Sequence, residues 1–275
     1  MIDTARRDSL AFLPAVASGP LVEYAGDTNV GMKRNHNEDY FSIFEDENLY
    51  IVADGMGGHS SGEVASRMAV ETIREFFTST SADPEATWPY KMDKHRGYEE
   101  NRLITGVKLS NLRIFEAAQR EAKYRGMGTT VVVLFFVDEG MYIGHVGDSR
   151  VYRVRGEKIE QLTEDHSLLN DYIKMKKLTD WEIANFPHKN VIVRALGMKE
   201  SVKVDTRFES AQKGDTFLLC SDGLSGMIAD DEILAIVKKN TDLKTAVAEL
   251  IAKANANGGT DNITCVLARW LGNGA

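Results

Sequence analysis

Acidic residues recur at the margins of short apolar segments in this sequence, and this placement points to a shared site. The apolar segments have the length and β-branched content of strands. The acids that flank them are Glu38, Asp39, Asp54, Asp148, Asp222 and Asp261. In an antiparallel sheet the end of one strand lies beside the start of its neighbour, so these carboxylates can converge on one rim. Because crowded carboxylates repel one another, the rim is expected to bind hard cations such as Mg²⁺ or Mn²⁺ through oxygen atoms.

Glycine adjoins three of these acids, in Asp54-Gly55, Gly147-Asp148 and Asp222-Gly223. Glycine allows unusual backbone angles and close approach, so such a turn can direct a carboxylate and a main-chain carbonyl at one ion. A single Asp-Gly pair is more often an ordinary turn. Its recurrence beside several predicted strands is what favours a metal site.

The elements that must position these acids are both strands and helices. Strands are predicted at 40–44, 49–53, 129–137, 141–146, 151–154, 216–220 and 263–268. The short connections at 138–140 and 155–157 predict antiparallel hairpins.

Helical periodicity is clearest between Leu243 and Ala254, behind a cap at Thr241 or Asp242. Further helices are predicted at about 62–77, at about 99–123 and behind a cap at Asp230 or Asp231, with a surface loop at 79–97. The polar stretch 165–190 is predicted to be a partly helical flap.

Length, composition and charge exclude several classes of protein. A chain of 275 residues with 43% hydrophobic content is expected to form a single globular domain, and its net charge of −8 argues against nucleic acid as a partner. The longest apolar run, 131–137, is far shorter than the roughly 20 residues of a membrane helix. The two cysteines, Cys220 and Cys265, form neither a disulfide framework nor a CxxC pair. A cytoplasmic location is therefore expected.

Six blocks of the sequence are distinctive, and four of them contain these acids. They are Arg34-Asn35-His36-Asn37-Glu38-Asp39, Val52-Ala53-Asp54-Gly55-Met56-Gly57-Gly58-His59, Gly128-Thr129-Thr130, Gly144-His145-Val146-Gly147-Asp148-Ser149-Arg150, Ser221-Asp222-Gly223 with Gly259-Thr260-Asp261-Asn262, and, more weakly, 190–197. In type and order they resemble the metal-dependent type-2C protein serine/threonine phosphatases, in the compact form common in bacteria. The resemblance spans about Tyr24 to Leu271, nearly the whole chain.

This resemblance implies an α+β fold, a four-layer α/β/β/α sandwich of two antiparallel sheets flanked by helices. Residues 21–271 would form the catalytic domain with its flap at 165–190, between a poorly ordered tail at 1–20 and a short tail at 272–275. The implied activity is hydrolysis of phosphoserine and phosphothreonine in proteins by water activated by two Mn²⁺ or Mg²⁺ ions, with a third ion in some compact members. The expected partners are phosphorylated proteins, among them Ser/Thr kinases and their targets; no nucleic acid or membrane is expected, and the protein is expected to be a monomer.

The resemblance also implies the roles of the metal ligands. Asp54 would bridge two cations, and Asp222 and Asp261 would complete the first site. The carbonyl of Gly55, with Glu38 acting through water, would serve the second.

Three further roles are implied in the same way. Asp39 would support the ligands, and Asp148 with Asp222 would hold a weaker third cation. Arg34 would clamp the substrate phosphate, a role suited to the planar, permanently charged guanidinium.

The group that protonates the leaving alkoxide is left open. Many eukaryotic members place His two residues after the bridging Asp, where this chain has Met56. Metal-bound water, His59, His145 or His166 are the alternatives, although an isolated histidine is more often structural. Cysteine-based chemistry is disfavoured, because neither cysteine precedes an Arg by six positions.

A catalytically silent domain of the same fold, binding a phosphoprotein or a regulator, is the alternative function. Retention of every principal acid argues against it, because unneutralised clustered acids destabilise a fold and a silent copy would be free to lose them.

Overall fold

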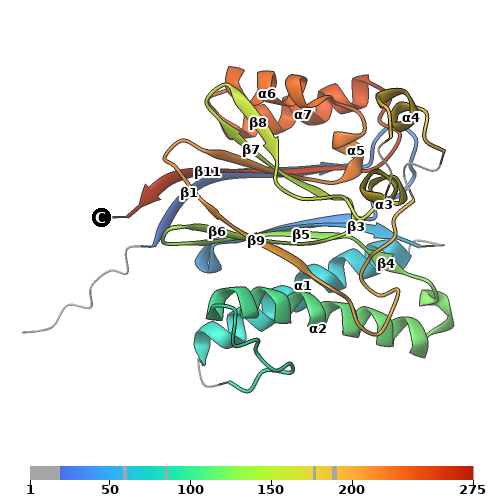
Figure 1. Ribbon diagram of the computed structural model, residues 1–275, viewed down its shortest axis with the longest axis vertical. Coiled ribbons are helices and arrows are strands. Elements are labelled where there is room, and N and C mark those ends of the chain that lie inside the picture. The colour runs from blue at the N-terminus through green and yellow to red at the C-terminus, as the bar shows by residue number, and fades with distance from the viewer. Residues whose placement is uncertain (1–18, 58–60, 84–85, 176–177, 188–190, 275) are drawn as a thin grey trace, which may run out of the picture.

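Two antiparallel sheets stacked between pairs of helices make up this computed structural model, which describes residues 19–57, 61–83, 86–175, 178–187 and 191–274 (Figure 1). One sheet has the order β1 (Pro20–Asn29), β11 (Ile263–Asn273), β10 (Thr216–Cys220), β7 (Arg150–Arg155) and β8 (Lys158–Gln161). The other has the order β2 (Asp39–Phe44), β3 (Leu49–Met56), β5 (Val131–Val137), β6 (Gly140–Val146) and β9 (Asp205–Ser210), with β4 (Gly128–Thr129) paired to β3.

The long helices cover the outer faces of the sheets (Figure 1). On the β3 side lie α1 (Ser61–Ala82) and α2 (Tyr98–Arg120), and on the β11 side lie α6 (Asp230–Lys239) and α7 (Leu243–Ala256). Shorter helical segments are α3 (Leu168–Met175), α4 (Asp180–Ala184), α5 (Asp222–Ser225), η1 (Glu45–Glu47) and η2 (Ala122–Tyr124). The four-layer sandwich implied by the sequence is confirmed.

The apolar strand β5 shows why the sandwich has three hydrophobic layers. Val131, Val133 and Phe135 pack in the layer that also contains α1 and α2 residues, whereas the alternate Val132, Leu134 and Phe136 pack between the two sheets. Because side chains alternate across a strand and both faces are covered, the whole segment is apolar. A third layer packs α6 and α7 against β10 and β11.

None of the described helices has the length and apolar character needed to span a bilayer.

Several predicted boundaries differ from the structure. The cap predicted at Asp230 or Asp231 is wrong, because α6 begins at Asp230 and the N-cap is Ala229, whose N–H donates to Glu232 at 3.4 Å. The acids of that first turn instead face the positive end of the helix. By contrast Asp242 caps α7 as predicted, accepting from the N–H of Thr245 at 2.8 Å.

Other elements are longer than predicted. Helix α1 continues to Ala82, into the loop predicted at 79–97, and β11 continues to Asn273, inside the tail predicted at 272–275. The hairpins predicted at 138–140 and 155–157 are confirmed by the antiparallel pairs β5–β6 and β7–β8. Residues 1–18 of the predicted N-terminal tail lie outside the described residues.

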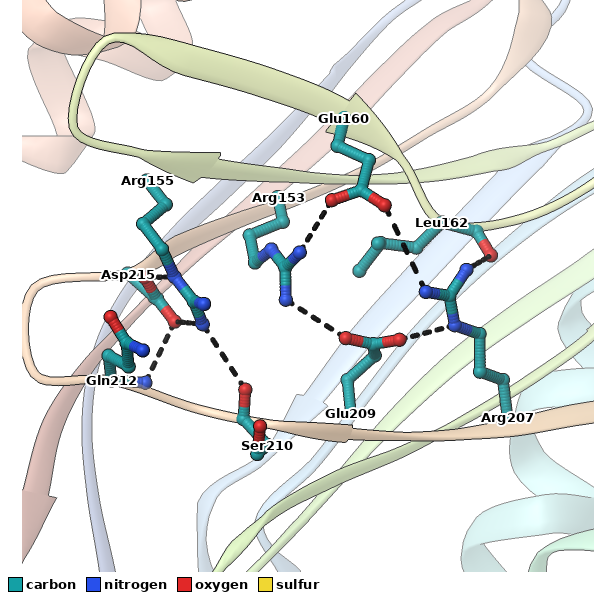
Figure 2. A network of polar contacts seen from close by, with 9 residues as sticks. All are labelled: Arg153, Arg155, Glu160, Leu162, Arg207, Glu209, Ser210, Gln212 and Asp215. Atoms are coloured by element: carbon teal, nitrogen blue, oxygen red, sulfur yellow. Dashed lines mark hydrogen bonds and ion pairs between the residues drawn. The ribbon is translucent and has the colours of Figure 1, made fainter.

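A network of ion pairs ties the edges of the two sheets together, between β7 and β8 of one sheet and β9 of the other (Figure 2). Arg153 on β7 reaches both Glu160 on β8 and Glu209 on β9, the latter at 2.9 Å. Arg207 on β9 pairs with Glu209 and lies 3.9 Å from Glu160. The side chains of Arg153 and Glu209 are only 15% and 12% exposed, so solvent screens their pair weakly.

We predict that Arg153→Ala lowers the free energy of unfolding by about 1–3 kcal/mol, because it removes the donor from one oxygen of the largely buried Glu209 carboxylate. The matched control is Lys239→Ala, which removes an ion pair to Glu249 from a lysine that is 68% exposed and is expected to cost much less. Chemical denaturation of both variants measures the difference. Equal losses would show that the network does not tie the sheets together.

Candidate active site

The predicted acids meet at one end of the sandwich. Asp39 and Asp54 face each other across β2 and β3, Asp222 begins α5 directly after β10, and Asp148 and Asp261 lie in the turns beside β6 and β11. The pKa of Asp54 is raised well above its usual value, first by burial and then by four neighbouring charges. Those charges belong to Asp39, Asp222, Asp148 and Asp261. We call Asp39, Asp54, Asp148, Asp222 and Asp261 the acid cluster.

Two threonines hold the backbone of Asp54. The N–H of Thr130 donates to the Asp54 carbonyl at 2.8 Å, and the N–H of Asp54 donates to the Thr130 hydroxyl at 3.1 Å. The Thr129 hydroxyl also donates to the Asp54 carbonyl, at 2.8 Å. A further 2.7 Å bond joins the Thr130 and Ser149 hydroxyls, so the Asp54 strand is linked to the turn that bears Asp148.

Asp39 is a buried member of the acid cluster. One carboxylate oxygen accepts from the hydroxyls of Ser221 at 2.8 Å and Thr264 at 2.7 Å. The other oxygen is buried and has no hydrogen-bond partner among the described residues. Burial raises the pKa of Asp39 to about 7, although the two hydroxyl bonds oppose that rise. The supporting role expected for Asp39 stays a prediction.

Ionisation of Asp148 and Asp222 is also disfavoured by their surroundings. Burial, followed by the charges of Asp222 and Asp165, raises the pKa of Asp148 to about 7. One oxygen of Asp148 is buried without a partner within the described part of the chain. Burial and then the charge of Asp261 raise the pKa of Asp222, and a hydrogen bond with Asp54 opposes the rise.

Gly55 and Glu38 lie together at the start of α1. The N–H of Gly55 donates to the Glu38 carbonyl at 3.1 Å, and the Glu38 carboxylate accepts from the N–H of Gly62 at 3.1 Å. A Cβ on Gly55 would lie 2.2 Å from the Gly62 carbonyl oxygen, so no other residue fits there without a shift. Glu38 is thus held by the positive end of a long helix.

Arg34 stands at the open side of the cluster. Its guanidinium is 2.6 Å from the Asp261 carboxylate, and its side chain is 50% exposed. Burial lowers the pKa of Arg34, but the hydrogen bond and charge of Asp261 outweigh it and raise the pKa overall. A permanently charged fork therefore faces both solvent and the acids.

A cavity of about 410 Å³ opens beside the acid cluster. Asp148, Asp222 and Asp261 line it together with residues of α5, with Leu169 of the flap and with Met227 just beyond α5. Larger hollows of about 480 Å³ between α1 and α2 and about 640 Å³ near Phe208 do not border the cluster, judged on the residues described. The cavity of about 410 Å³ is therefore the one positioned for a reaction at the acid cluster.

The histidines are arranged for structure rather than for metal binding. His145, His166 and Asp205 lie close together, but the two imidazole rings stack at 4.7 Å with 15° between their planes. Ring lone pairs lie in the ring plane, so parallel stacked rings do not converge on one ion. Arg194 and Lys203 moreover lie within 3.2 Å of the Asp205 carboxylate.

Both rings are also already hydrogen bonded. His145 donates through Nε2 to the Glu164 carbonyl, and His166 contacts Gly147 and Asp205. Burial lowers the pKa of both, that of His166 to about 4. The predicted candidate His59 lies outside the described residues.

The hydroxyls around the acids were not assigned a role from sequence. Thr130 and Ser221 lie inside the matching blocks, which is the one signal that could have identified them, whereas Thr264 lies outside all of them. Asn262, also in a block, joins three segments: it accepts from the Glu38 N–H at 2.8 Å and donates to the carbonyls of Val30 and His36.

Comparison with known proteins agrees with this geometry. Residues 32–272 match the family model described as Protein phosphatase 2C. The serine/threonine phosphatase stp of Listeria monocytogenes serovar 1/2a is 38% identical over 247 residues, which cover 87% of this chain and 92% of that protein.

Solved structures show the same fold. The serine/threonine phosphatase PstP/Ppp of Mycobacterium tuberculosis superposes with a TM-score of 0.79 at 31% identity, over 90% of this chain and 98% of that one. A catalytic domain of PstP solved in complex with two manganese ions superposes with a TM-score of 0.74 at 30% identity, over 90% of this chain and 97% of that one. The chain accordingly belongs to the protein phosphatase 2C family and is a protein serine/threonine phosphatase.

Proposed function

We propose that the acid cluster holds two divalent cations, Mn²⁺ or Mg²⁺, and that the enzyme uses them to hydrolyse phosphoserine and phosphothreonine in proteins. The observation that carries this proposal is the convergence of carboxylates whose pKa values are raised first by burial and then by the charges of neighbouring carboxylates. Such a group of acids is costly unless protons or cations neutralise it.

The donor atoms fit hard cations. The cluster offers carboxylate oxygens, with no cysteine or histidine among its members, and this is the ligand type preferred by Mg²⁺ and Mn²⁺. Asp148 carries a buried oxygen with no partner in the described part of the chain, and so does the supporting Asp39. A cation beside Asp148 would satisfy an oxygen that the protein leaves unpaired. The structural relative that contains two manganese ions supports the same assignment.

Within this proposal Asp54 would hold both cations, and Asp222 and Asp261 would complete the first site. The Gly55 carbonyl and Glu38, through water, would serve the second site. Asp148 and Asp222 offer a weaker third site beside the cavity. When bound, the cations supply positive charge and make hydroxide available near neutral pH.

The chain's own residues then orient the substrate. A phosphate monoester resists attack because its negative charge repels hydroxide, so positive charge at its oxygens is needed. Arg34 is placed to supply it, because its fork lies at the open side of the cluster and can pair with two phosphate oxygens. Asp39 holds Ser221 and Thr264 and so keeps the floor of the site fixed.

The proton for the leaving alkoxide does not come from the stacked histidines. His166 is hydrogen bonded through both ring nitrogens, and the Nε2 of His145 is committed to Glu164. Met56 cannot supply a proton. Of the two candidates that remain, water at the site and His59, we propose water.

The proposed substrates are phosphorylated proteins, including Ser/Thr kinases and their targets. The proposed active unit is a monomer in the cytoplasm, with residues 21–271 as the catalytic domain. A silent binding module is disfavoured, because the whole acid cluster and Arg34 are present at one site.

We predict that Asp54→Asn removes nearly all phosphatase activity while leaving the metal-free fold intact or more stable, since one repelling charge is deleted. Hydrolysis of a phosphothreonine peptide and a thermal melt without metal measure the two effects. Asp46→Asn, which removes the same charge from an exposed position outside the cluster, is the control and should change neither. Activity of Asp54→Asn within tenfold of wild type would refute the bridging role.

We predict that Arg34→Ala raises the KM for a phosphopeptide by roughly tenfold or more, with a smaller change in kcat, because it removes a bidentate phosphate contact. Arg34→Lys keeps the charge but not the planar guanidinium, so its KM should lie between those of the wild type and Arg34→Ala. Steady-state kinetics, with exposed Arg125→Ala as the control, separates these terms. A collapse of kcat at unchanged KM would contradict the clamp.

We predict that the metal-free protein loses stability as pH rises from about 4 to about 7. Asp39 and Asp148 keep their protons up to about pH 7 when folded but lose them near pH 3.8 when unfolded. In this window the folded state binds more protons, so the free energy of unfolding falls with rising pH, by roughly 4 kcal/mol at most for each group. Thermal melts in chelator across this range measure the slope. Asp148→Asn should flatten it, and excess Mn²⁺ at pH 7.5 should restore stability; a flat wild-type profile in chelator would contradict the account.

A further inference from the structure

His166 is hydrogen bonded to both main-chain polar groups of Gly147, beside the acid cluster. Its main-chain N–H donates to the Gly147 carbonyl at 2.9 Å, and its ring Nδ1 accepts from the Gly147 N–H at 3.0 Å. Gly147 immediately precedes Asp148 and has a φ of +114°, a conformation that favours glycine. The direction of the Asp148 side chain therefore depends on a turn that two hydrogen bonds from His166 hold in place.

The acceptor role of Nδ1 fixes the protonation pattern of the ring. With Nδ1 accepting, the proton of the neutral imidazole lies on Nε2, which donates to the Asp205 carboxylate at 3.0 Å. Arg194 lies 2.9 Å from the same nitrogen but is itself a donor, so its partner is the Asp205 carboxylate at 3.1 Å. Asp205 thus orients the ring, and the ring orients Gly147.

The same residue begins the flap. The Val193 N–H donates to the His166 carbonyl at 2.9 Å, the Leu168 N–H donates to the Val191 carbonyl at 2.8 Å, and Ser167 pairs with Ile192 in a β-bridge. These bonds join the two ends of the flap, and we call 166–168 with 191–193 the flap base. His166 is therefore the residue shared by the flap base and the Asp148 turn.

The other side of Asp148 is held independently. Ser149 bonds to Thr130, whose hydroxyl accepts from the N–H of Asp54. Asp148 sits between these two attachments with one buried oxygen unpaired among the described residues, and its side chain borders the cavity. A carboxylate fixed in this way, with an oxygen left available, is arranged for a cation rather than for a protein donor.

We propose that His166 is a positioning residue that presents the Asp148 carboxylate to a divalent cation and couples occupancy of that site to the flap base. The inference rests on the proposed function, because it requires the acid cluster to bind cations. It assigns to His166, one of the two stacked histidines, a role as a hydrogen-bonded link acting through Gly147, and not as a proton donor or a metal ligand.

Titration of Mn²⁺ by calorimetry tests the proposal. Asp148→Asn first identifies the binding step that depends on Asp148. His166→Leu, which keeps a similar volume without a ring acceptor, should weaken that same step by tenfold or more and leave the tighter uptake within threefold of wild type. His166→Asn places an amide oxygen near the former Nδ1, and should recover most of the lost affinity.

A signal from Gly147 separates positioning from general stability. Amide hydrogen exchange at Gly147 should accelerate in His166→Leu and return toward wild type in His166→Asn, while thermal melts report any loss of fold. If His166→Leu does not fold, Asp205→Ala and Asp205→Asn provide the test: only the alanine variant removes the acceptor of Nε2–H, so it alone should weaken the Asp148-dependent step.

The outcomes separate the inference from the proposed function. Unchanged Asp148-dependent binding in a folded His166→Leu protein overturns the inference alone, as does failure of His166→Asn to restore it. If His166→Leu does not fold, equal Asp148-dependent Mn²⁺ binding by Asp205→Ala and Asp205→Asn overturns the inference. Absence of Mn²⁺ uptake by the wild-type protein overturns the proposed function, and the inference falls with it.

Discussion

Mutual repulsion among buried carboxylates is the constraint on which this structure depends. Asp39, Asp54, Asp148, Asp222 and Asp261 are brought together from both sheets. Burial and the charges of the other four raise the pKa of Asp54, and burial with the charges of Asp222 and Asp261 raises that of Asp39. The apolar layers on either side of the sheets must supply the stability that makes this crowding tolerable. Cations would reverse the sign of the interaction, so the same crowding that weakens the empty fold becomes the basis of metal affinity.

Short hydrogen-bonded attachments keep the acids from separating. Thr130 holds Asp54, Ser221 and Thr264 hold Asp39, and His166 holds the turn before Asp148. Each attachment uses a backbone group or a neutral hydroxyl or imidazole, so it adds little charge to the cluster. A rigid cluster with unpaired oxygens is preorganised, because the cost of arranging the ligands is met during folding.

The fold and the acids could be predicted from sequence for different reasons. The apolar run of β5 and the periodicity of α7 are strong local signals, and the acids stand out because strand margins do not otherwise require them. The edge strand β9 has no such signal, since none of its residues is buried and all but Phe208 are polar. Strand order was not predictable either, because pairs such as β1 with β11 join residues more than 200 positions apart.

The attachments around the acids were beyond sequence reasoning. Serine and threonine occur throughout the chain, and nothing local distinguishes Thr264 from any other strand threonine. The role of His166 likewise depends on the pairing of the flap base with Val193 and on the left-handed backbone of Gly147. Such roles arise from tertiary geometry, whereas the acids were visible because their chemistry is unusual for their position.

The central claim is most directly tested by anomalous diffraction at the manganese edge from a crystal soaked in Mn²⁺. The account predicts a pair of anomalous peaks between Asp54, Asp222 and Asp261, with Asp54 contacting both. Carboxylates that point away from one another, with no peak among them at saturating Mn²⁺, would contradict it.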